Sequence, residues 1–383
     1  MKRLPLVSLA FLLGAATQAA AFVIPNPPVL DNKAYVVMDF DSGKILAESN
    51  PHAQLEPASL TKMMTSYIVE HALSTGRLKE SDPVSVSEYA WCRGTSAESC
   101  MYLPLHGQAP VIDMLRGVII QSGNDASKAL AEHMAGSEPA FAEIMNAEAK
   151  RLGMTETNFM NATGLPDPAH LTSAHDMAVL ARAIIRDNAQ YYPIYAEKEF
   201  TYNGIKQGNR NALLYTDPTV DGLKTGHTNA AGYCLVASSK RGNMRLITVV
   251  MGTSSMQARA DQTRALFNWG FSSYETVKPL PAGKILADAK VWFGTTDSVK
   301  AGLDHDLAIT LPRGKKDGVE AVTRINPDLK APIAKGQQVG EVVVTLGGET
   351  IATQPVVAME AVEEAGFLVR IWHHLKRFLT SLF

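Results

Sequence analysis

Residues 221–234 read DGLKTGHTNAAGYC, and their predicted β-strand contains four residues that are unusual in a sheet core: Lys224, Thr225, Gly226 and His227. Side chains alternate between the two faces of a strand, so Lys224 and Gly226 share one face and the other two share the opposite face. Gly226 has no side chain where another backbone comes close, which suits a strand that accepts an extended peptide along its edge. Lys224 and Thr225 can then bind a carboxylate, although a solvent-facing Lys-Thr pair is the ordinary alternative.

The segments around this stretch predict an α+β domain. YCLVASSK and RLITVVMG read as two further strands separated by Gly-containing turns, and MQARADQTRALFNWG then reads as a helix. Near the other end, residues 34–50 have the pattern of a β-hairpin, and residues 59–190 have mostly helical apolar spacing. This order predicts one antiparallel sheet, assembled from both ends of the segment 22–278 and flanked by helices.

A second domain is predicted after Lys278-Pro279-Leu280-Pro281, which suggests a boundary. Residues 279–365 contain short β-like runs such as KVWFG, LAITLP and EVVVTL, with a Gly347-Gly348 turn. This composition predicts a small all-β domain, in which we find no motif that carries chemistry.

The last segment, residues 366–383, is predicted to be an amphipathic helix. FLVRIWHHLKRFLTSLF places its apolar residues at helical spacing, and it contains basic but no acidic residues. At ~1.5 Å per residue it spans about 25 Å, and its charges make a transmembrane role unfavourable. A helix lying in the membrane interface fits this pattern better, and docking of the same face onto the protein's own core is the alternative.

The first 21 residues have the pattern of a secretory signal peptide. Lys2 and Arg3 precede an apolar run over residues 4–13, and Ala19-Ala20-Ala21 supplies small residues for cleavage. A buried helix or a membrane anchor is the alternative, which the short length of the run disfavours. The mature protein is therefore expected to work outside the cytoplasm.

Composition restricts the possible function classes. The chain has 383 residues, a formal net charge of -2 and neither a basic stripe nor zinc-ligand spacing, so nucleic acid is not an expected partner. Of three cysteines, Cys92 and Cys100 lie eight apart in a polar stretch and can form a disulfide in an oxidising compartment; two free thiols are the alternative. Cys234 lies among apolar residues and is expected in the core.

The first candidate catalytic pair is Ser59 and Lys62, in PASLTKMMTSYIVEHALSTG. Pro57 and the apolar spacing indicate a buried helix that begins near Ser59, and residues at i and i+3 share a helix face. The lysine Nζ can then reach the serine Oγ, and a neutral lysine can remove the proton of the serine if burial lowers its pKa. Taken alone, S-x-x-K is also the pattern of a capping serine beside a surface lysine.

A second candidate group is Ser122-Gly123-Asn124, between an apolar helical run and a helix that opens at Asp125. A helix-to-helix turn with an Asn cap is the ordinary interpretation. A serine and an amide at such a turn can instead relay protons and hydrogen-bond the amide of a substrate.

Together the three motifs resemble those of the penicillin-recognising serine acyl transferases: S-x-x-K, then S-x-N, then K-T-G, in that order and in an exported chain. NFMNATGLPDPAHLTSAHDMAVLARAII and VDGLKTGHTNAAGYCLVASSKR look like the corresponding stretches of D-alanyl-D-alanine carboxypeptidases of low molecular mass. The resemblance covers nearly the whole chain, including the β domain and the amphipathic tail. It implies a β-lactamase/transpeptidase-like fold.

The resemblance also implies a role for each motif residue. Ser59 is the expected acylated nucleophile, Lys62 its general base, and Ser122 a relay of the proton to the leaving amine. The implied substrate-binding residues are Asn124, Lys224, Thr225, Gly226 and His227, the last through its backbone N–H. No metal or cofactor is expected.

The expected activity is serine D-Ala-D-Ala carboxypeptidase, acting on peptidoglycan stem peptides and inhibited by β-lactams that stay attached to Ser59. The expected location is the periplasm, on the outer face of the inner membrane, with the tail on the membrane surface. Three alternatives remain: a serine β-lactamase, a D,D-endopeptidase and a non-catalytic peptidoglycan-binding scaffold. No glutamate between the second and third motifs lies in a recognisable deacylation motif, which disfavours the β-lactamase.

Overall fold

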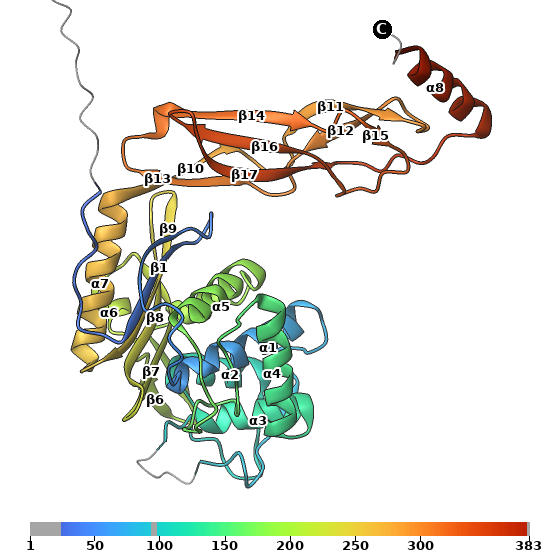
Figure 1. Ribbon diagram of the computed structural model, residues 1–383. Coiled ribbons are helices and arrows are strands. Elements are labelled where there is room, and N and C mark those ends of the chain that lie inside the picture. Colours follow the sequence, from blue (N-terminus) through green and yellow to red (C-terminus); the bar gives the residue numbers. More distant parts are fainter. Residues whose placement is uncertain (1–23, 93–97, 381–383) are drawn as a thin grey trace, which may run out of the picture.

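The computed structural model describes residues 24–92 and 98–380. The predicted signal peptide, residues 1–21, lies outside them. The chain forms a helix-rich domain around one sheet, a separate β domain, and a C-terminal helix at the far end of that β domain (Figure 1). The predicted α+β architecture is confirmed.

The main sheet contains five antiparallel strands in the order β2-β1-β9-β8-β7, so strands from both ends of the segment lie side by side. Its members are β1 (Ala34–Asp39), β2 (Ile45–Ser49), β7 (Val220–Thr228), β8 (Gly232–Arg241) and β9 (Met244–Thr253). β7 is an edge strand.

Alternation along the strands gives the sheet two buried faces. Val36 and Met38 of β1 belong to the larger core, beneath the helical block, whereas Tyr35 and Val37 belong to the core beneath α7 (Met256–Ser273). Both faces are apolar because helices cover both, which explains the nearly unbroken hydrophobic runs of β8 and β9.

The helical block carries the first two motifs. A short 3-10 turn, η1 (Ala58–Thr61), leads into the buried helix α1, and the π-helical turn η2 precedes α3. The helices and turns of this block are α1 (Lys62–Ser74), α2 (Val111–Arg116), η2 (Gly117–Gln121), α3 (Asn124–Ala135), α4 (Glu138–Leu152), α5 (Ala174–Asp187) and η3 (Tyr192–Ala196). The smaller elements of the domain are β3 (Pro83–Ser85), β4 (Gln108–Pro110), β5 (Glu199–Tyr202), β6 (Ile205–Gly208) and α6 (Leu213–Thr216).

The β domain begins directly after α7 with β10 (Tyr274–Leu280), so the expected boundary at residues 278/279 lies within this strand. β10 pairs with β13, and six other strands form a sheet in the order β14-β16-β17-β12-β11-β15. The strand that pairs with β10 is β13 (Leu307–Pro312). The six strands of the other sheet are β11 (Ile285–Trp292), β12 (Ser298–Gly302), β14 (Val319–Ile325), β15 (Leu329–Lys330), β16 (Gln338–Leu346) and β17 (Glu349–Ala358); a 3-10 turn, η4 (Lys316–Gly318), precedes β14. Thr276 Oγ1 donates to the buried Asp39 carboxylate at 2.6 Å, which joins this domain to β1.

The C-terminal helix α8 (Phe367–Thr380) leaves its apolar side chains exposed. Its buried residue is His373, whose Nδ1 accepts the Phe293 N–H at 2.8 Å and whose ring meets Trp292 edge-on. The polar side of the helix therefore faces the β domain. None of the helices in the described part of the chain is long and apolar enough to cross a membrane.

Candidate active site

Ser59 and Lys62 lie at the junction of η1 and α1. Lys62 Nζ donates hydrogen bonds to Ser59 Oγ at 3.1 Å and to the Thr163 carbonyl at 2.6 Å. The i, i+3 spacing puts the two side chains on one face, and the second contact fixes the lysine against a segment about 100 residues away. The lysine is thus held with its nitrogen directed at the hydroxyl.

The Lys62 side chain is completely buried. Burial lowers its pKa to about 7, and the positive charge of Arg210 acts in the same direction. A large fraction of the amine is therefore neutral near neutral pH and able to accept the Ser59 proton.

Gly164 brings the Thr163 carbonyl to this lysine. A Cβ on Gly164 would lie 1.8 Å from the Ala58 carbonyl oxygen, and its φ of +83° is one that glycine adopts freely. The loop can therefore rest directly on η1 only with glycine at this position.

Ser122 and Asn124 enter from the second motif. Ser122 ends η2 in the left-handed conformation, with φ 61°, and its Oγ is buried without a hydrogen-bond partner among the described residues. The Asn124 backbone N–H donates to the Ser99 carbonyl at 2.7 Å, and its side-chain amide donates to Glu98 Oε2 at 3.0 Å. Both residues line the same cavity as Ser59.

The third motif lies on the edge strand β7, where Lys224 and Thr225 are buried. A Cβ on Gly226 would lie 2.9 Å from the Pro57 carbonyl oxygen. The backbone that requires this glycine is thus that of the segment leading into η1, whereas the sequence suggested only an extended peptide. The edge position of β7 still leaves one side of the strand unpaired.

Lys224 and His227 differ in their surroundings. Burial holds the pKa of Lys224 well below its usual range, and Lys62, Arg210 and Arg259 add to this. The His227 imidazole is exposed and stacks on Tyr233, with ring centroids 4.0 Å apart. Its side chain therefore forms part of the rim of the site.

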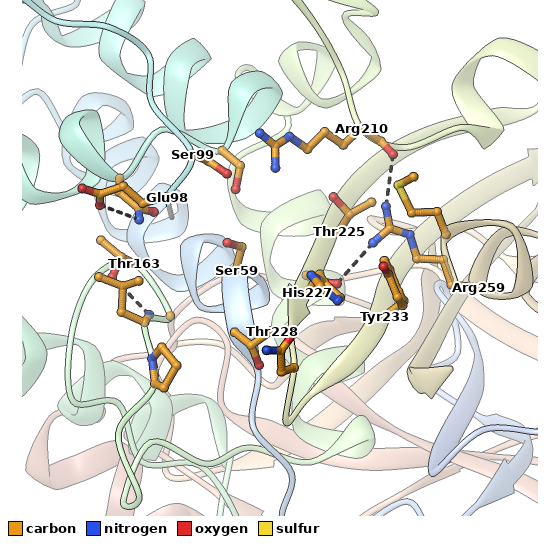
Figure 2. A pocket seen from close by; sticks show the side chains of 18 residues that line it. Ser59, Glu98, Ser99, Thr163, Arg210, Thr225, His227, Thr228, Tyr233 and Arg259 are labelled. Carbon is orange, nitrogen blue, oxygen red and sulfur yellow. Dashed lines mark hydrogen bonds between the residues drawn. The ribbon is translucent and has the colours of Figure 1, made fainter. Parts of the chain in front are cut away.

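A cavity of about 930 Å³ joins the three motifs (Figure 2). Six of the eight predicted catalytic and substrate-binding residues line it: Ser59, Ser122, Asn124, Thr225, Gly226 and His227. Lys62 and Lys224 are buried behind this wall, with Lys62 in contact with Ser59.

Two arginines of the cavity wall, Arg210 and Arg259, escaped the sequence analysis. Arg259 on α7 is buried, and its Nη1 donates to the Gly226 carbonyl at 3.2 Å. The sequence contained a signal for Arg259, because helical spacing places this charged residue on the same face of α7 as Thr263, Leu266 and Phe267, which are buried. Arg210, in a loop, gave none. In Figure 2 the Arg259 guanidinium lies on the same side of the cavity as Thr225 and Tyr233, whereas the Arg210 side chain extends across the cavity toward Ser99.

Cys92 and Cys100 are joined by a disulfide with a Cα–Cα distance of 6.0 Å, whereas Cys234 is free and buried. The loop they close brings Glu98 and Ser99 to the cavity wall; residues 93–97 lie outside the described part of the chain. Glu98 also pairs with Lys128, at 3.6 Å.

Comparisons with known proteins agree with this geometry. Residues 21–255 match the family model described as D-alanyl-D-alanine carboxypeptidase, and residues 274–364 match that of the penicillin-binding protein 5 C-terminal domain. The chain is 46% identical over 362 residues to the D-alanyl-D-alanine carboxypeptidase DacA of Haemophilus influenzae, covering 94% of this chain and 92% of that protein.

Solved structures give the same result. Penicillin-binding protein 5 from Haemophilus influenzae superimposes with a TM-score of 0.82 at 47% identity, covering 89% of this chain and 100% of that one. Cefotaxime-bound penicillin-binding protein D2 from Listeria monocytogenes has a TM-score of 0.59 at 28% identity, covering 64% of this chain and 99% of that one. The chain belongs to the D-alanyl-D-alanine carboxypeptidases, a family of serine peptidases.

Proposed function

We propose that this carboxypeptidase removes the terminal D-alanine from peptidoglycan pentapeptide stems through an acyl-enzyme on Ser59. The observation that carries the assignment is the 3.1 Å contact between Ser59 Oγ and the buried Lys62 Nζ. A base of pKa about 7 beside a hydroxyl at a helix start is the arrangement that nucleophilic catalysis by serine requires.

The proposed reaction has two steps. Ser59 Oγ attacks the carbonyl carbon of the penultimate D-alanine while Lys62 takes its proton, and backbone N–H groups of Ser59 and His227 stabilise the oxyanion. The C–N bond then breaks, and Ser122 passes a proton to the departing amine of D-alanine. Water hydrolyses the Ser59 ester and restores the free enzyme.

We assign recognition of the substrate to cavity residues of the second and third motifs. The terminal carboxylate would bind to the Thr225 hydroxyl beside the buried Lys224, in the field of two cations, Arg210 and Arg259. Asn124 would hold the stem amide. The positive charges of Arg210 and Arg259 in the cavity wall support a substrate that ends in a free carboxylate.

β-Lactams are proposed to acylate the same serine, because their strained amide and adjacent carboxylate imitate the dipeptide. The related Listeria protein has been solved with cefotaxime bound. Among the described residues that line the cavity, Glu98 is the one carboxylate. It accepts a hydrogen bond from Asn124 and forms an ion pair with Lys128. A carboxylate in that position is poorly placed to activate a deacylating water, which favours a carboxypeptidase over a β-lactamase.

The proposed location is the periplasm, with α8 on the outer face of the inner membrane. Outward-facing residues of α8 include Phe367, Leu368, Ile371, Trp372 and Leu375. An apolar surface of this kind, rimmed by basic residues, suits the interface of a bilayer with anionic headgroups.

The direct test is D-alanine release from a diacyl-Lys-D-Ala-D-Ala tripeptide by the purified mature protein and its Ser59→Ala variant. Release that disappears in the variant is the expected result. Release by neither protein would favour an endopeptidase or a scaffold, and equal release by both would overturn the assignment of Ser59.

A further inference from the structure

A group of metal-ligating side chains lies outside the active-site cavity. His52 follows β2, Glu156 follows α4, and His175 is the second residue of α5. Their ligand atoms all lie within 4.8 Å of one another, and His52 Nδ1 is 3.5 Å from Glu156 Oε2. Since they come from three distant segments, their sequence spacing gives no signal of a site.

Backbone contacts hold the three segments together. The His175 N–H donates to the Pro51 carbonyl at 2.9 Å, and Leu55 and Thr172 exchange two hydrogen bonds of 2.8 and 2.9 Å. The Gln54 side-chain amide donates to the Glu156 carbonyl at 3.3 Å. The side chains are therefore close because of the fold, whether or not an ion is bound.

A buried carboxylate orients two of the three residues. Asp176 is fully buried, and its Oδ1 lies 3.4 Å from His175 Nδ1. Its Oδ2 accepts the Glu156 N–H at 2.9 Å and the Thr157 hydroxyl at 2.7 Å. A carboxylate behind a histidine is the usual support of a metal-binding imidazole, since it fixes the ring and leaves the other nitrogen for the ion.

We propose that His52, Glu156 and His175 bind one Zn²⁺, with water as the fourth ligand. Two imidazoles and a carboxylate form a donor set that zinc favours, and the ligand atoms of a tetrahedral site lie about 3.3 Å apart. The widest separation here exceeds that by about 1.5 Å. A rotation of the His52 side chain, which is 59% exposed, would close the difference.

The zinc site would have a structural role rather than a catalytic one. None of its three residues lines the active-site cavity. It would tie the segment that leads into η1 to the start of α5, next to the strand-like pair of Leu55 and Thr172. Zinc is thus expected to raise thermal stability with little effect on turnover.

The test uses the mature chain without a polyhistidine tag, stripped of metal and titrated with ZnCl₂ by calorimetry. One Zn²⁺ per chain is expected to bind at micromolar concentration or below, with an increase in melting temperature. His52→Ala and His175→Ala should each weaken binding by about 100-fold or more, since even loss of a supporting residue costs 10- to 100-fold. Acylation by a penicillin should remain unchanged, which shows that both variants fold.

His106→Ala is the matched control, because His106 is an exposed histidine 4.0 Å from Glu88 with no third ligand nearby in the part of the chain that the structure describes. This variant should bind zinc as the unaltered chain does. Zinc binding that persists in both His52→Ala and His175→Ala, or the absence of saturable binding up to about 100 μM, would overturn the proposal.

Discussion

Lys62 Nζ lies 3.1 Å from Ser59 Oγ, and the lysine side chain is completely shielded from solvent. Because burial lowers its pKa to about 7, the neutral, basic form increases as pH rises through 7. The second-order rate of acylation by a chromogenic penicillin should therefore rise about tenfold per pH unit well below 7 and level off above about 8. A rate that does not change between pH 5.5 and about 8.5 would contradict Lys62 as the base.

Arg210 and Arg259 provide a matched pair of variants. Both are expected to help bind the carboxylate, so Arg210→Gln and Arg259→Gln should each raise KM for the tripeptide. Burial is the main cause of the low pKa of Lys62, and of these two arginines only Arg210 adds to it. In Arg210→Gln the midpoint of the pH profile should therefore move to higher pH, with acylation at pH 6.5 falling about two- to fivefold, whereas Arg259→Gln should keep the midpoint. Equal midpoints in both variants would remove Arg210 from this role.

The fold and the motif residues could be predicted from the sequence because their signals are local. Apolar spacing distinguishes strands from helices, and Ser59 and Lys62 stand out because polar groups are costly on a buried helix. The role of Arg210 in the site, and the contact that requires glycine at position 226, could not be predicted in the same way. Their roles depend on contacts between segments far apart in the chain, as with the Pro57 carbonyl oxygen that faces Gly226.

A substitution at Gly164 tests whether the loop that presents the Thr163 carbonyl must pack directly against η1. Gly164→Ala would place a Cβ 1.8 Å from the Ala58 carbonyl oxygen, in addition to an unfavourable φ. The expected loss of stability is about 3 kcal/mol, with a marked decrease in acylation as the Lys62 contact is displaced. Gly136→Ala is the control, because φ there is +79° and nothing lies within 4 Å of the added Cβ, so only about 1 kcal/mol should be lost. Thermal melting and acylation rates of the two variants should differ accordingly; similar losses would refute the steric argument.

The disulfide between Cys92 and Cys100 should matter for both stability and substrate binding. Its loop carries Ser99, whose carbonyl accepts the Asn124 N–H. Replacing both cysteines by serine should cost about 2.5 kcal/mol by the chain-entropy relation and raise KM for the tripeptide. Cys234→Ser, at the free buried cysteine, separates loss of the bond from loss of a thiol. An unchanged KM in the double variant would show that the loop holds its position without the bond.

The orientation of α8 gives the last prediction. His373 lies against Phe293 and Arg377 forms an ion pair with Asp328, so the opposite, apolar side faces outward. Burial of one large apolar side chain contributes about 1.5–3 kcal/mol, so Ile371→Asp combined with Leu375→Asp should weaken binding to vesicles of anionic phospholipid by about 100-fold or more. Cosedimentation measures this, and truncation after Gly366 should abolish it.

Ile205→Asp is the control, since Ile205 is an exposed apolar residue on β6, in the other domain. It should leave cosedimentation unchanged. If the double variant still sediments with vesicles while the truncated chain does not, the polar side of α8 must contact the lipid, and the helix would have to leave the β domain to bind.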